Sequence, residues 1–306
     1  MEKRKIPNSD LEVSTICLGT MTFGTPVGEH DAIKLTHWAV DNGINFIDTA
    51  NMYEGYARSA GSSGGVAEEI VGKALSGRRD KVILATKLGN KVGPEPEDDG
   101  TSPAAIRKQL DISLNRLATD YIDIYYLHKP DAHTSMVDIL CTLNEAIEAG
   151  KIRYYGVSNY SAEQFSELLK VADENSLPRP IIHQPAYSLL SRGIEKELLP
   201  LCKREQIAAA PYQILQGGLL TGKYQRGQEL PSNSRKAEMN GWVWDLTDEI
   251  FSQLEQIEVD ARSKGRTMLQ HTILETLGKP AVVSLVMGVK RINQLEALIN
   301  FSNYLE

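Results

Sequence analysis

The sequence predicts an α/β fold: a (β/α)8 barrel, or TIM barrel, formed as a single domain by residues 1–306. Eight short apolar segments alternate with longer amphipathic segments along the chain, which indicates repeated strand–helix units. Several short segments are apolar nearly throughout, as is typical of strands buried on both faces. A doubly wound sheet is the alternative, but "GTMTFG" (19–24) after the first strand does not match its G-x-G-x-x-G fingerprint.

The expected strands are short, and most are followed by polar residues. They span residues 13–19, 44–48, 81–87, 121–127, 152–157, 181–184, 207–212 and 281–287. We expect residues 1–12, which precede the first strand, to cover the bottom of the barrel. Residues 213–245 form a long loop after the seventh strand, and loops of this length in a compact domain are usually functional.

Helical patterns fill the intervals between these strands. Residues 103–117 carry an apolar stripe at helical spacing, and Ser102 is the expected N-cap. Residues 161–172 follow a capping-box pattern that begins at Ser161. A third helix is expected over 31–43, with the aspartate at its first position as the cap.

Composition excludes several classes of protein. The chain is 42% hydrophobic and 24% charged with a net charge of −7, so it offers no basic field for nucleic acid. It shows no signal peptide and no apolar run of membrane-spanning length. Cys17, Cys141 and Cys202 are far apart, which favours reduced cysteines in a cytoplasmic protein over disulfides or a metal site.

Four residues at strand ends form a chemical set. Asp48 ends the second strand, Tyr53 follows five residues later, Lys87 ends the third strand and His128 follows the fourth. Each alone has an ordinary interpretation, such as a turn aspartate, a solvated lysine or a loop histidine. Because the carboxyl ends of barrel strands meet at one mouth, we expect the four side chains to converge there.

Together these groups suit the reduction of a carbonyl. The ammonium of Lys87 would favour the Tyr53 phenolate and so lower the tyrosine pKa, while Asp48 orients Lys87. His128 would hydrogen-bond the substrate's carbonyl oxygen, so Tyr53 serves as a general acid aimed at an oxyanion. Because none of these residues supplies a hydride, a cofactor is expected to do so.

With these motifs in place, the sequence resembles the aldo-keto reductase family. The matching stretches follow family order and cover most of the chain: "INFIDTANMY" (44–53), "ILATK" (83–87), "DYIDIYYLHKPD" (120–131), "GKIRYYGVSNYSAEQ" (150–164), "HQPAYSLLSR" (183–192) and "QGGLLTGKY" (216–224). The resemblance implies a (β/α)8 barrel and NADPH-dependent reduction of aldehydes or ketones without a metal. It places the catalytic tetrad on the four strand-end residues, with Tyr53 as the acid in reduction and the base in oxidation.

The resemblance also implies a cofactor site. It assigns the nicotinamide carboxamide to Ser158, Asn159 and Gln184, and stacking on the nicotinamide to Tyr212. Further matching positions are Thr20, Met21, Asp48, Gln213, Ile214, Leu215, Gln216 and Gly218, with Lys223 at the diphosphate. Gly288, Lys290, Arg291 and Gln294 match positions around the adenosine 2′-phosphate. Two adjacent cations suit a phosphate better than a ribose hydroxyl, which favours NADP over NAD.

Two details depart from familiar patterns. Ala297 and Leu298 stand where many relatives carry Glu-Asn near the adenine, which leaves the adenine contacts open. The stretch 217–223 reads G-x-x-x-x-G-K like a P-loop, but Tyr224 stands where that loop requires Ser or Thr to ligate magnesium. We therefore interpret this stretch as a clasp over the cofactor instead of a nucleotide-hydrolysing loop.

The substrate is expected to be a small-molecule carbonyl compound bound over Tyr53 and His128. Four loop aromatics are candidates for the pocket wall, with simple loop packing as the alternative: Phe23, Tyr56, Trp242 and Trp244. Two other functions stay open. One is a Schiff-base lyase that uses Lys87, since such barrels also carry a strand-end lysine. The other is a non-catalytic NADPH-binding accessory or redox-sensor subunit. No nucleic acid or membrane partner is expected, and the oligomeric state stays open.

Overall fold

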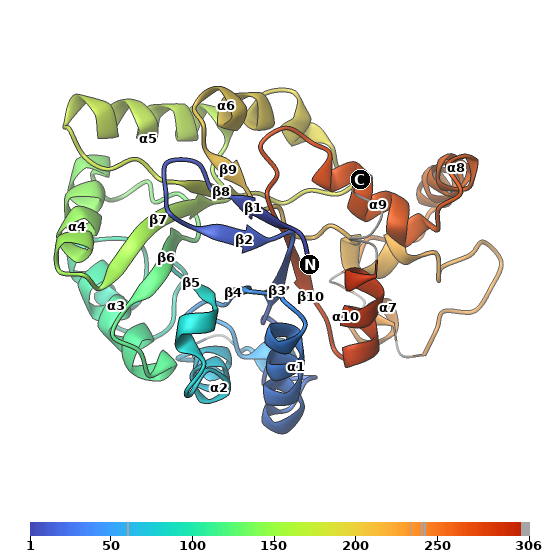
Figure 1. Ribbon diagram of the computed structural model, residues 1–306, viewed down its shortest axis with the longest axis horizontal. Helices are drawn as coiled ribbons and strands as arrows, with labels where there is room; N and C mark the ends of the chain where they lie inside the picture. Colours follow the sequence, from blue (N-terminus) through green and yellow to red (C-terminus); the bar gives the residue numbers. More distant parts are fainter. Residues whose placement is uncertain (60, 233, 240, 242, 301–306) are drawn as a thin grey trace.

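A ring of parallel strands forms the centre of the protein. The computed structural model describes residues 1–59, 61–232, 234–239, 241 and 243–300. Within these residues, one eight-stranded sheet runs in the order β10-β3-β4-β5-β6-β7-β8-β9 (Figure 1). The strands are β3 (Ile16–Gly19), β4 (Phe46–Asp48), β5 (Ile83–Leu88), β6 (Ile122–Leu127), β7 (Ile152–Ser158), β8 (Ile182–Gln184), β9 (Ala208–Ala209) and β10 (Leu285–Gly288). A parallel bridge between Ala209 of β9 and Val282, just before β10, closes the ring, which confirms the predicted barrel.

Helices cover the outside of this ring, as Figure 1 shows for α1 to α6. They are α1 (Glu29–Asp41), α2 (Val66–Ala74), α3 (Pro103–Leu117), α4 (Met136–Glu148), α5 (Ala162–Glu174), α6 (Leu198–Arg204), α7 (Arg235–Glu238), α8 (Asp248–Ser263), α9 (Met268–Leu277) and α10 (Ile292–Ile299). One apolar cluster packs between strands and helices, and a second fills the barrel interior with side chains such as Phe46, Ile124 and Tyr126. Strands enclosed by two apolar layers explain the nearly continuous apolar segments of the sequence.

Two of the predicted helix starts are confirmed and the third is wrong by two residues. The Ser102 hydroxyl caps α3, and Ser161 begins the capping box of α5. Helix α1 begins at Glu29, after Gly28, instead of at the predicted Asp31. Asp31 lies inside the first turn, where its negative charge suits the positive end of the helix dipole.

The first predicted strand, 13–19, is divided in the structure. Its first residues belong to β2 (Glu12–Ser14), which pairs antiparallel with β1 (Lys3–Lys5). The barrel strand begins only at Ile16, because the backbone N–H of Ser14 turns to the Asn45 side chain at 2.7 Å. The hairpin of β1 and β2 lies across the ring of strands (Figure 1), in agreement with the expected cover over residues 1–12.

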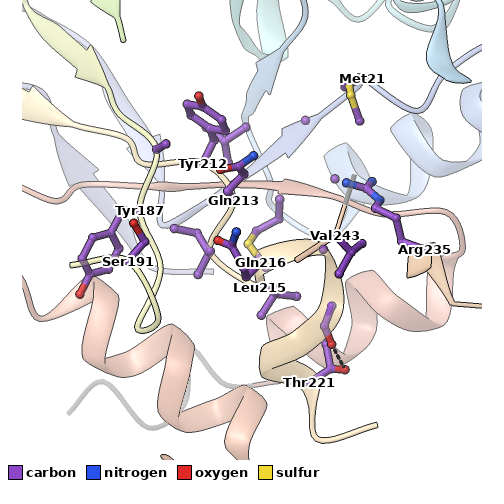
Figure 2. A pocket seen from close by; sticks show the side chains of 18 of the residues that line it. Met21, Tyr187, Ser191, Tyr212, Gln213, Leu215, Gln216, Thr221, Arg235 and Val243 are labelled. Carbon is purple, nitrogen blue, oxygen red and sulfur yellow. Dashed lines mark hydrogen bonds between the residues drawn. The ribbon is translucent and has the colours of Figure 1, made fainter. Parts of the chain in front are cut away.

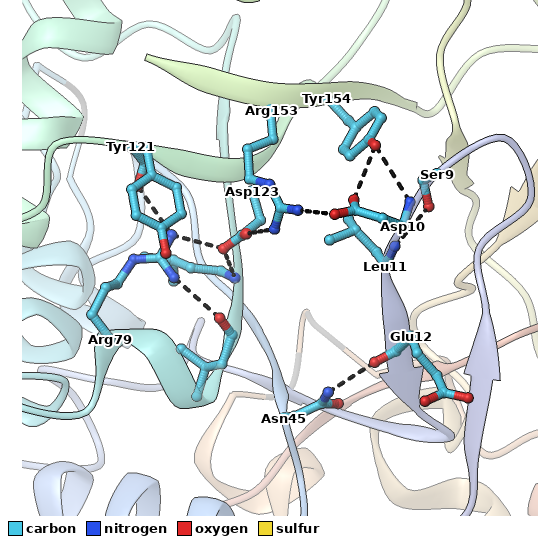
Figure 3. Close-up of polar contacts among 12 residues, drawn as sticks. Ser9, Asp10, Leu11, Glu12, Asn45, Arg79, Tyr121, Asp123, Arg153 and Tyr154 are labelled. Carbon is cyan, nitrogen blue, oxygen red and sulfur yellow. Dashed lines mark hydrogen bonds and ion pairs between the residues drawn. The ribbon is translucent and has the colours of Figure 1, made fainter. Parts of the chain in front are cut away.

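A charged network fastens this amino end of the barrel (Figure 3). Asp123 at the start of β6 is buried, and its carboxylate accepts hydrogen bonds from Arg79 and Arg153 at 2.7 Å each. It also accepts the backbone N–H of Leu84 at 2.9 Å. Arg153 reaches on to Asp10 beside the hairpin, at 2.6 Å. The carboxylate therefore ties β6 to β5 and β7, and Arg153 extends the network to the amino-terminal cover.

The long loop predicted after the seventh strand packs over the carboxyl ends of the strands. It contains a short 3-10 helix, η5 (Gln216–Thr221), followed by α7. Leu219, Leu220 and Tyr224 of this loop pack with α8 and α9 in a third apolar cluster. The loop is thus held from its outer side, while its inner side faces the barrel mouth.

None of the helices among the described residues is long and apolar enough to cross a bilayer.

Candidate active site

The four strand-end residues meet at the carboxyl end of the barrel. The Lys87 Nζ lies 2.5 Å from an Asp48 carboxylate oxygen and 3.2 Å from the Tyr53 hydroxyl. The rings of Tyr53 and His128 meet edge to face, with centroids 5.8 Å apart. The structure therefore brings the four predicted side chains together, and Lys87 is the fully buried one among them.

Lys87 is fully buried and donates hydrogen bonds to Asp48, to the Thr49 carbonyl at 2.8 Å and to Tyr53. Burial on its own pulls the lysine pKa down, but the charge of Asp48 and these hydrogen bonds outweigh it, so the pKa is raised. Lys87 is therefore an ammonium at neutral pH.

The pKa of the Tyr53 hydroxyl is shifted in the direction opposite to the one expected from the sequence. Burial raises its pKa, and the nearby charge of Lys87 lowers it by less, so the net pKa is raised instead of lowered. The predicted contribution of the ammonium is present, but the desolvation of the phenol is larger. Tyr53 therefore keeps its proton at neutral pH, as a general acid must.

His128 is neutral in this setting. Burial lowers its pKa well below the ordinary value, and the positive charges of Lys87 and Lys129 lower it further. Its Nδ1 is buried and has no hydrogen-bond partner among the described residues. A neutral imidazole carries one N–H donor, so His128 can hydrogen-bond an oxygen without adding a charge.

A chain of polar contacts leads away from Asp48 across the barrel mouth. Gln184 donates to the second Asp48 oxygen at 2.9 Å, and Ser158 donates to the Gln184 carbonyl at 2.8 Å. Asn159 donates to the Ser158 hydroxyl at 3.2 Å, and the Tyr212 hydroxyl donates to the Asn159 side chain at 2.7 Å. The residues predicted for the nicotinamide end are thus already joined to the tetrad.

A cleft of about 1080 Å³ opens above these residues, and most of the predicted site residues line it. Figure 2 shows side chains around it from well-separated parts of the chain, including Met21, Tyr212 and Arg235. Around the tetrad it is lined by Thr20, Met21, Asp48, Tyr53, His128, Ser158, Gln184 and Tyr212. Further along it is lined by Gln213, Ile214, Leu215, Gln216, Gly218, Lys223, Trp244, Gly288, Lys290 and Gln294.

The loop of η5 closes one side of the cleft through tight backbone turns. Gly218 has a φ of 100°, and a Cβ atom at this position would lie 2.8 Å from the Lys223 Nζ. Gln213 and Gln216 also have positive φ values, of 63° and 46°, although they are not glycines. Such conformations cost energy and cluster at functional sites. The backbone therefore takes an unfavourable shape where it borders the cleft.

Three cations gather at the far end of the cleft. Lys223 is partly buried; burial lowers its pKa, and the positive charges of Lys290 and Arg235 lower it further, while Glu238 opposes them. Glu238 pairs with Lys290. Like charges held together in a partly desolvated place attract an anion such as a phosphate. Arg235, the first residue of α7, was not predicted because no sequence motif surrounds it. The signal that could have indicated it is its positive charge in the same long segment as Lys223.

Some predicted residues lie elsewhere. Phe23 is fully buried in the core, because the loop after β3 folds back and pairs it with Val27. Tyr56 does not line the cleft: its hydroxyl accepts a hydrogen bond from Arg235 at 3.1 Å. Trp242 lies outside the described residues, and Trp244 lines the cleft.

Two predicted cofactor residues stand beside the cleft instead of on its wall. Arg291 is the N-cap of α10, and its backbone N–H donates to Gln294 at 3.2 Å. Asn159 is exposed and has a φ of 64°; it bonds to the His128 carbonyl at 2.8 Å. Lys87 is buried beneath the cleft floor and does not line the cleft; it contacts Asp48 and Tyr53, which do.

Comparison with known proteins gives consistent matches over the whole length. Residues 15–305 match the model of the Aldo/keto reductase family. The chain is 35% identical to Protein tas of Escherichia coli (strain K12), over 98% of this chain and 92% of that protein. It is 34% identical to a probable voltage-gated potassium channel subunit beta of Arabidopsis thaliana, over 97% and 89%. It is 31% identical to an L-glyceraldehyde 3-phosphate reductase of E. coli K12, over 100% and 88%.

Proposed function

The chain belongs to the aldo/keto reductase family, and from this premise we propose that it is an NADPH-dependent enzyme that reduces an aldehyde or a ketone to an alcohol. The observation that carries the proposal is the contact of buried Lys87 with both Asp48 and Tyr53 on the floor of the cleft. A small-molecule carbonyl compound is the proposed substrate, and the cytoplasm is the proposed compartment.

The residues around the cleft fit a dinucleotide phosphate. Amide and hydroxyl groups of Ser158, Asn159 and Gln184 suit a carboxamide, and the Tyr212 ring offers a stacking surface. At the other end, Lys223 and Lys290 line the cleft in the positive field that Arg235 shares. When bound, the reduced dinucleotide supplies the hydride.

The protein's own residues supply the proton. In the proposed reaction Tyr53 donates its hydroxyl proton to the carbonyl oxygen as that oxygen gains negative charge. The adjacent Lys87 ammonium stabilises the phenolate that is left, and Asp48 keeps Lys87 charged and oriented. Neutral His128 donates its N–H to the same oxygen. In the reverse direction, the Tyr53 phenolate takes the proton back.

The cation cluster supports NADP over NAD. Glu238 opposes these cations and pairs with Lys290, whereas Asp245, which also lines the cleft, pairs with Lys236. Three cations against one carboxylate suit a ligand with an additional phosphate better than a ribose hydroxyl. Arg291, which follows Lys290, is the N-cap of α10 and does not line the cleft.

A second candidate function rests on the relative in Arabidopsis thaliana, which is named as a probable potassium channel subunit beta. This likeness supports an NADPH-binding accessory or redox-sensor role in place of turnover. A Schiff-base lyase has less support, because Lys87 is buried, paired with Asp48 and held as an ammonium, which is a poor nucleophile.

Substitution Tyr53→Phe tests the proposal. We expect the turnover of an aldehyde panel, followed by loss of NADPH absorbance, to fall by roughly 10³-fold, because general acid catalysis is removed. The NADPH dissociation constant should stay unchanged. The control is Tyr154→Phe, which removes a hydroxyl at the opposite end of the barrel, where it contacts Asp10. Retained turnover in Tyr53→Phe would show that another group donates the proton.

The same assay separates the alternatives. NADPH binding without turnover of any carbonyl in the panel would favour the accessory or sensor role. Trapping of a carbonyl compound on Lys87 by borohydride would favour the lyase. Tighter binding of NADH than of NADPH would contradict the cofactor assignment while leaving the reductase intact.

A further inference from the structure

Tyr53 lies in a connection that has little regular structure of its own. It runs from β4 to α2, and among its described residues the one regular element is a three-residue 3-10 helix, Gly55–Ala57. A catalytic group must be held to within about 0.5 Å of its working position by the residues around it. Backbone hydrogen bonds hold part of it, such as that from the Tyr53 N–H to the Ala50 carbonyl at 3.0 Å. Buried side chains from outside the connection add to this hold.

Asn51, two residues before Tyr53, is the buried anchor of this connection. Its backbone N–H donates to the carbonyl of Lys87 at 3.0 Å, and its side-chain amide donates to Gln109 at 3.1 Å. Its own carbonyl accepts a hydrogen bond from Arg116 at 3.4 Å. Asn51 is fully buried. Three partners, two of them on α3, therefore hold the backbone just before the catalytic tyrosine.

Gln109 is itself held in place. It is 3% exposed, and its amide donates to the Glu97 carbonyl at 3.3 Å and to the Asp98 carboxylate at 3.2 Å. Asp98 in turn pairs with Lys108 at 2.8 Å. Both ends of the Gln109 amide are therefore used, which fixes its orientation toward Asn51.

Arg116 holds the far end of the same connection. Its guanidinium donates to the Ser63 carbonyl at 3.2 Å and lies against Gly65, where a Cβ atom would be 2.2 Å from it. It also pairs with the fully buried Glu68 at 3.4 Å. Glu68 accepts a hydrogen bond from Thr86 at 2.6 Å, the residue before Lys87. One side chain thus links the end of the connection to the strand that carries the catalytic lysine.

Gln109 and Arg116 are seven residues apart, which places them on the same face of α3 two turns apart. We propose that they are positioning residues that hold the β4–α2 connection, through Asn51 and Ser63, so that the Tyr53 hydroxyl stays at Lys87. This proposal rests on the proposed function of Tyr53 as the acid. It assigns α3 a role in turnover although the helix contributes nothing to the cleft wall.

The test compares Gln109→Met and Arg116→Ala with Arg107→Gln in the full chain. Arg107 lies on the exposed face of α3 and pairs with Glu145 at 2.7 Å. We expect kcat for 4-nitrobenzaldehyde to fall on the order of 10- to 100-fold in the first two variants, since small misplacements cost this much. The NADPH dissociation constant should stay within about twofold in both, because no residue of α3 lines the cleft. Arg107→Gln should match the wild type.

Two further readouts separate positioning from simple loss of fold. Gln109→Met leaves no buried charge unpaired, so it remains informative if Arg116→Ala fails to fold. Millimolar guanidinium should restore part of the turnover of Arg116→Ala by occupying the vacated place. The proposal is overturned if both variants keep wild-type kcat per NADPH-binding site, or if kcat falls only in proportion to folded protein.

The proposal and the proposed function can fail separately. Hydrogen exchange of the backbone amides of residues 49–57 requires no turnover, and Gln109→Met should speed it by at least about tenfold. If the wild type reduces no carbonyl but exchange still accelerates, the anchoring stands and the reductase assignment falls. If exchange does not change, the anchoring itself is wrong.

Discussion

The two ends of the barrel handle charge in opposite ways. At the amino end, buried Asp123 is matched by Arg79 and Arg153, and Arg153 is matched again by Asp10 (Figure 3). At the carboxyl end, the positive charges of Lys223, Arg235 and Lys290 act on one another, and the Glu238 carboxylate opposes them. The same strands form both ends, so the difference in charge pairing arises from the side chains at each end and not from the backbone.

This contrast indicates that the charges at the amino end contribute to stability and those at the carboxyl end to ligand binding. A charge network whose members satisfy one another leaves nothing for a ligand, but it loses free energy if a member is removed. A cluster of like charges has the reverse property, because a bound anion satisfies what the protein leaves unmatched. The amino end is therefore expected to respond to mutation in unfolding, and the carboxyl end in ligand affinity.

In this comparison of the two ends, the largest expected effect is that of Asp123→Ala at the amino end. It leaves two arginines facing each other and the backbone N–H of Leu84 without its acceptor. We expect the free energy of unfolding to fall by about 3 kcal/mol, the lower part of the range for breaking a buried pair, because both arginines are partly exposed. Denaturant titration measures it.

The matched control for Asp123→Ala is Asp111→Ala, which removes an exposed carboxylate that pairs with Lys151 at 2.6 Å. Its effect should stay below about 1 kcal/mol. Turnover per folded molecule should not change in either variant. Similar losses of stability in both would mean that the network at the amino end has no special role.

A smaller effect is expected from Lys223→Ala at the carboxyl end. Removing one of three cations should raise the NADPH dissociation constant about tenfold, or about 1.4 kcal/mol. The free energy of unfolding should stay constant or rise slightly, because repulsion within the cluster is relieved. Fluorescence titration with NADPH measures the affinity, and Lys34→Ala, at an exposed position of α1, is the control. An unchanged affinity would show that the loop does not clasp the cofactor.

The smallest expected effect is in the pH profile. Reduction requires Tyr53 with its proton, and burial raises its pKa above its ordinary value of about 10. Since the active acid is lost only as pH rises through that pKa, kcat/KM for reduction should be level from pH 7 to 9. His128, with its lowered pKa, does not titrate in this window. A midpoint below 9 would mean that Lys87 outweighs burial.

The sequence was sufficient to predict the barrel and the location of the tetrad. The carboxyl ends of the strands in a parallel barrel converge independently of loop conformation. Asp48, Lys87 and His128 could therefore be placed at the barrel mouth from the strand order alone. Tyr53 followed because its distance from Asp48 is short. The capping residues Ser102 and Ser161 act locally, within one helical turn, and were predictable for that reason.

What the sequence could not predict depends on how distant loops fold. Phe23 belongs to a loop whose return into the core has no local signal. Arg235 reaches the cleft only because η5 and α7 pack back over the mouth. The net pKa of Tyr53 depends on how deeply the phenol is buried, which spacing along the chain does not reveal.

The left-handed backbone at Asn159, Gln213 and Gln216 has a consequence for anyone who wishes to make this protein more heat-resistant. A common strategy puts glycine where φ is positive, since each such non-glycine residue costs of order 1 kcal/mol. Here that strategy would remove three amide side chains from around the cleft. These positions should therefore be kept out of any stabilised library, and the search directed to Ser176 and Gln206, which adopt the same conformation away from the cleft.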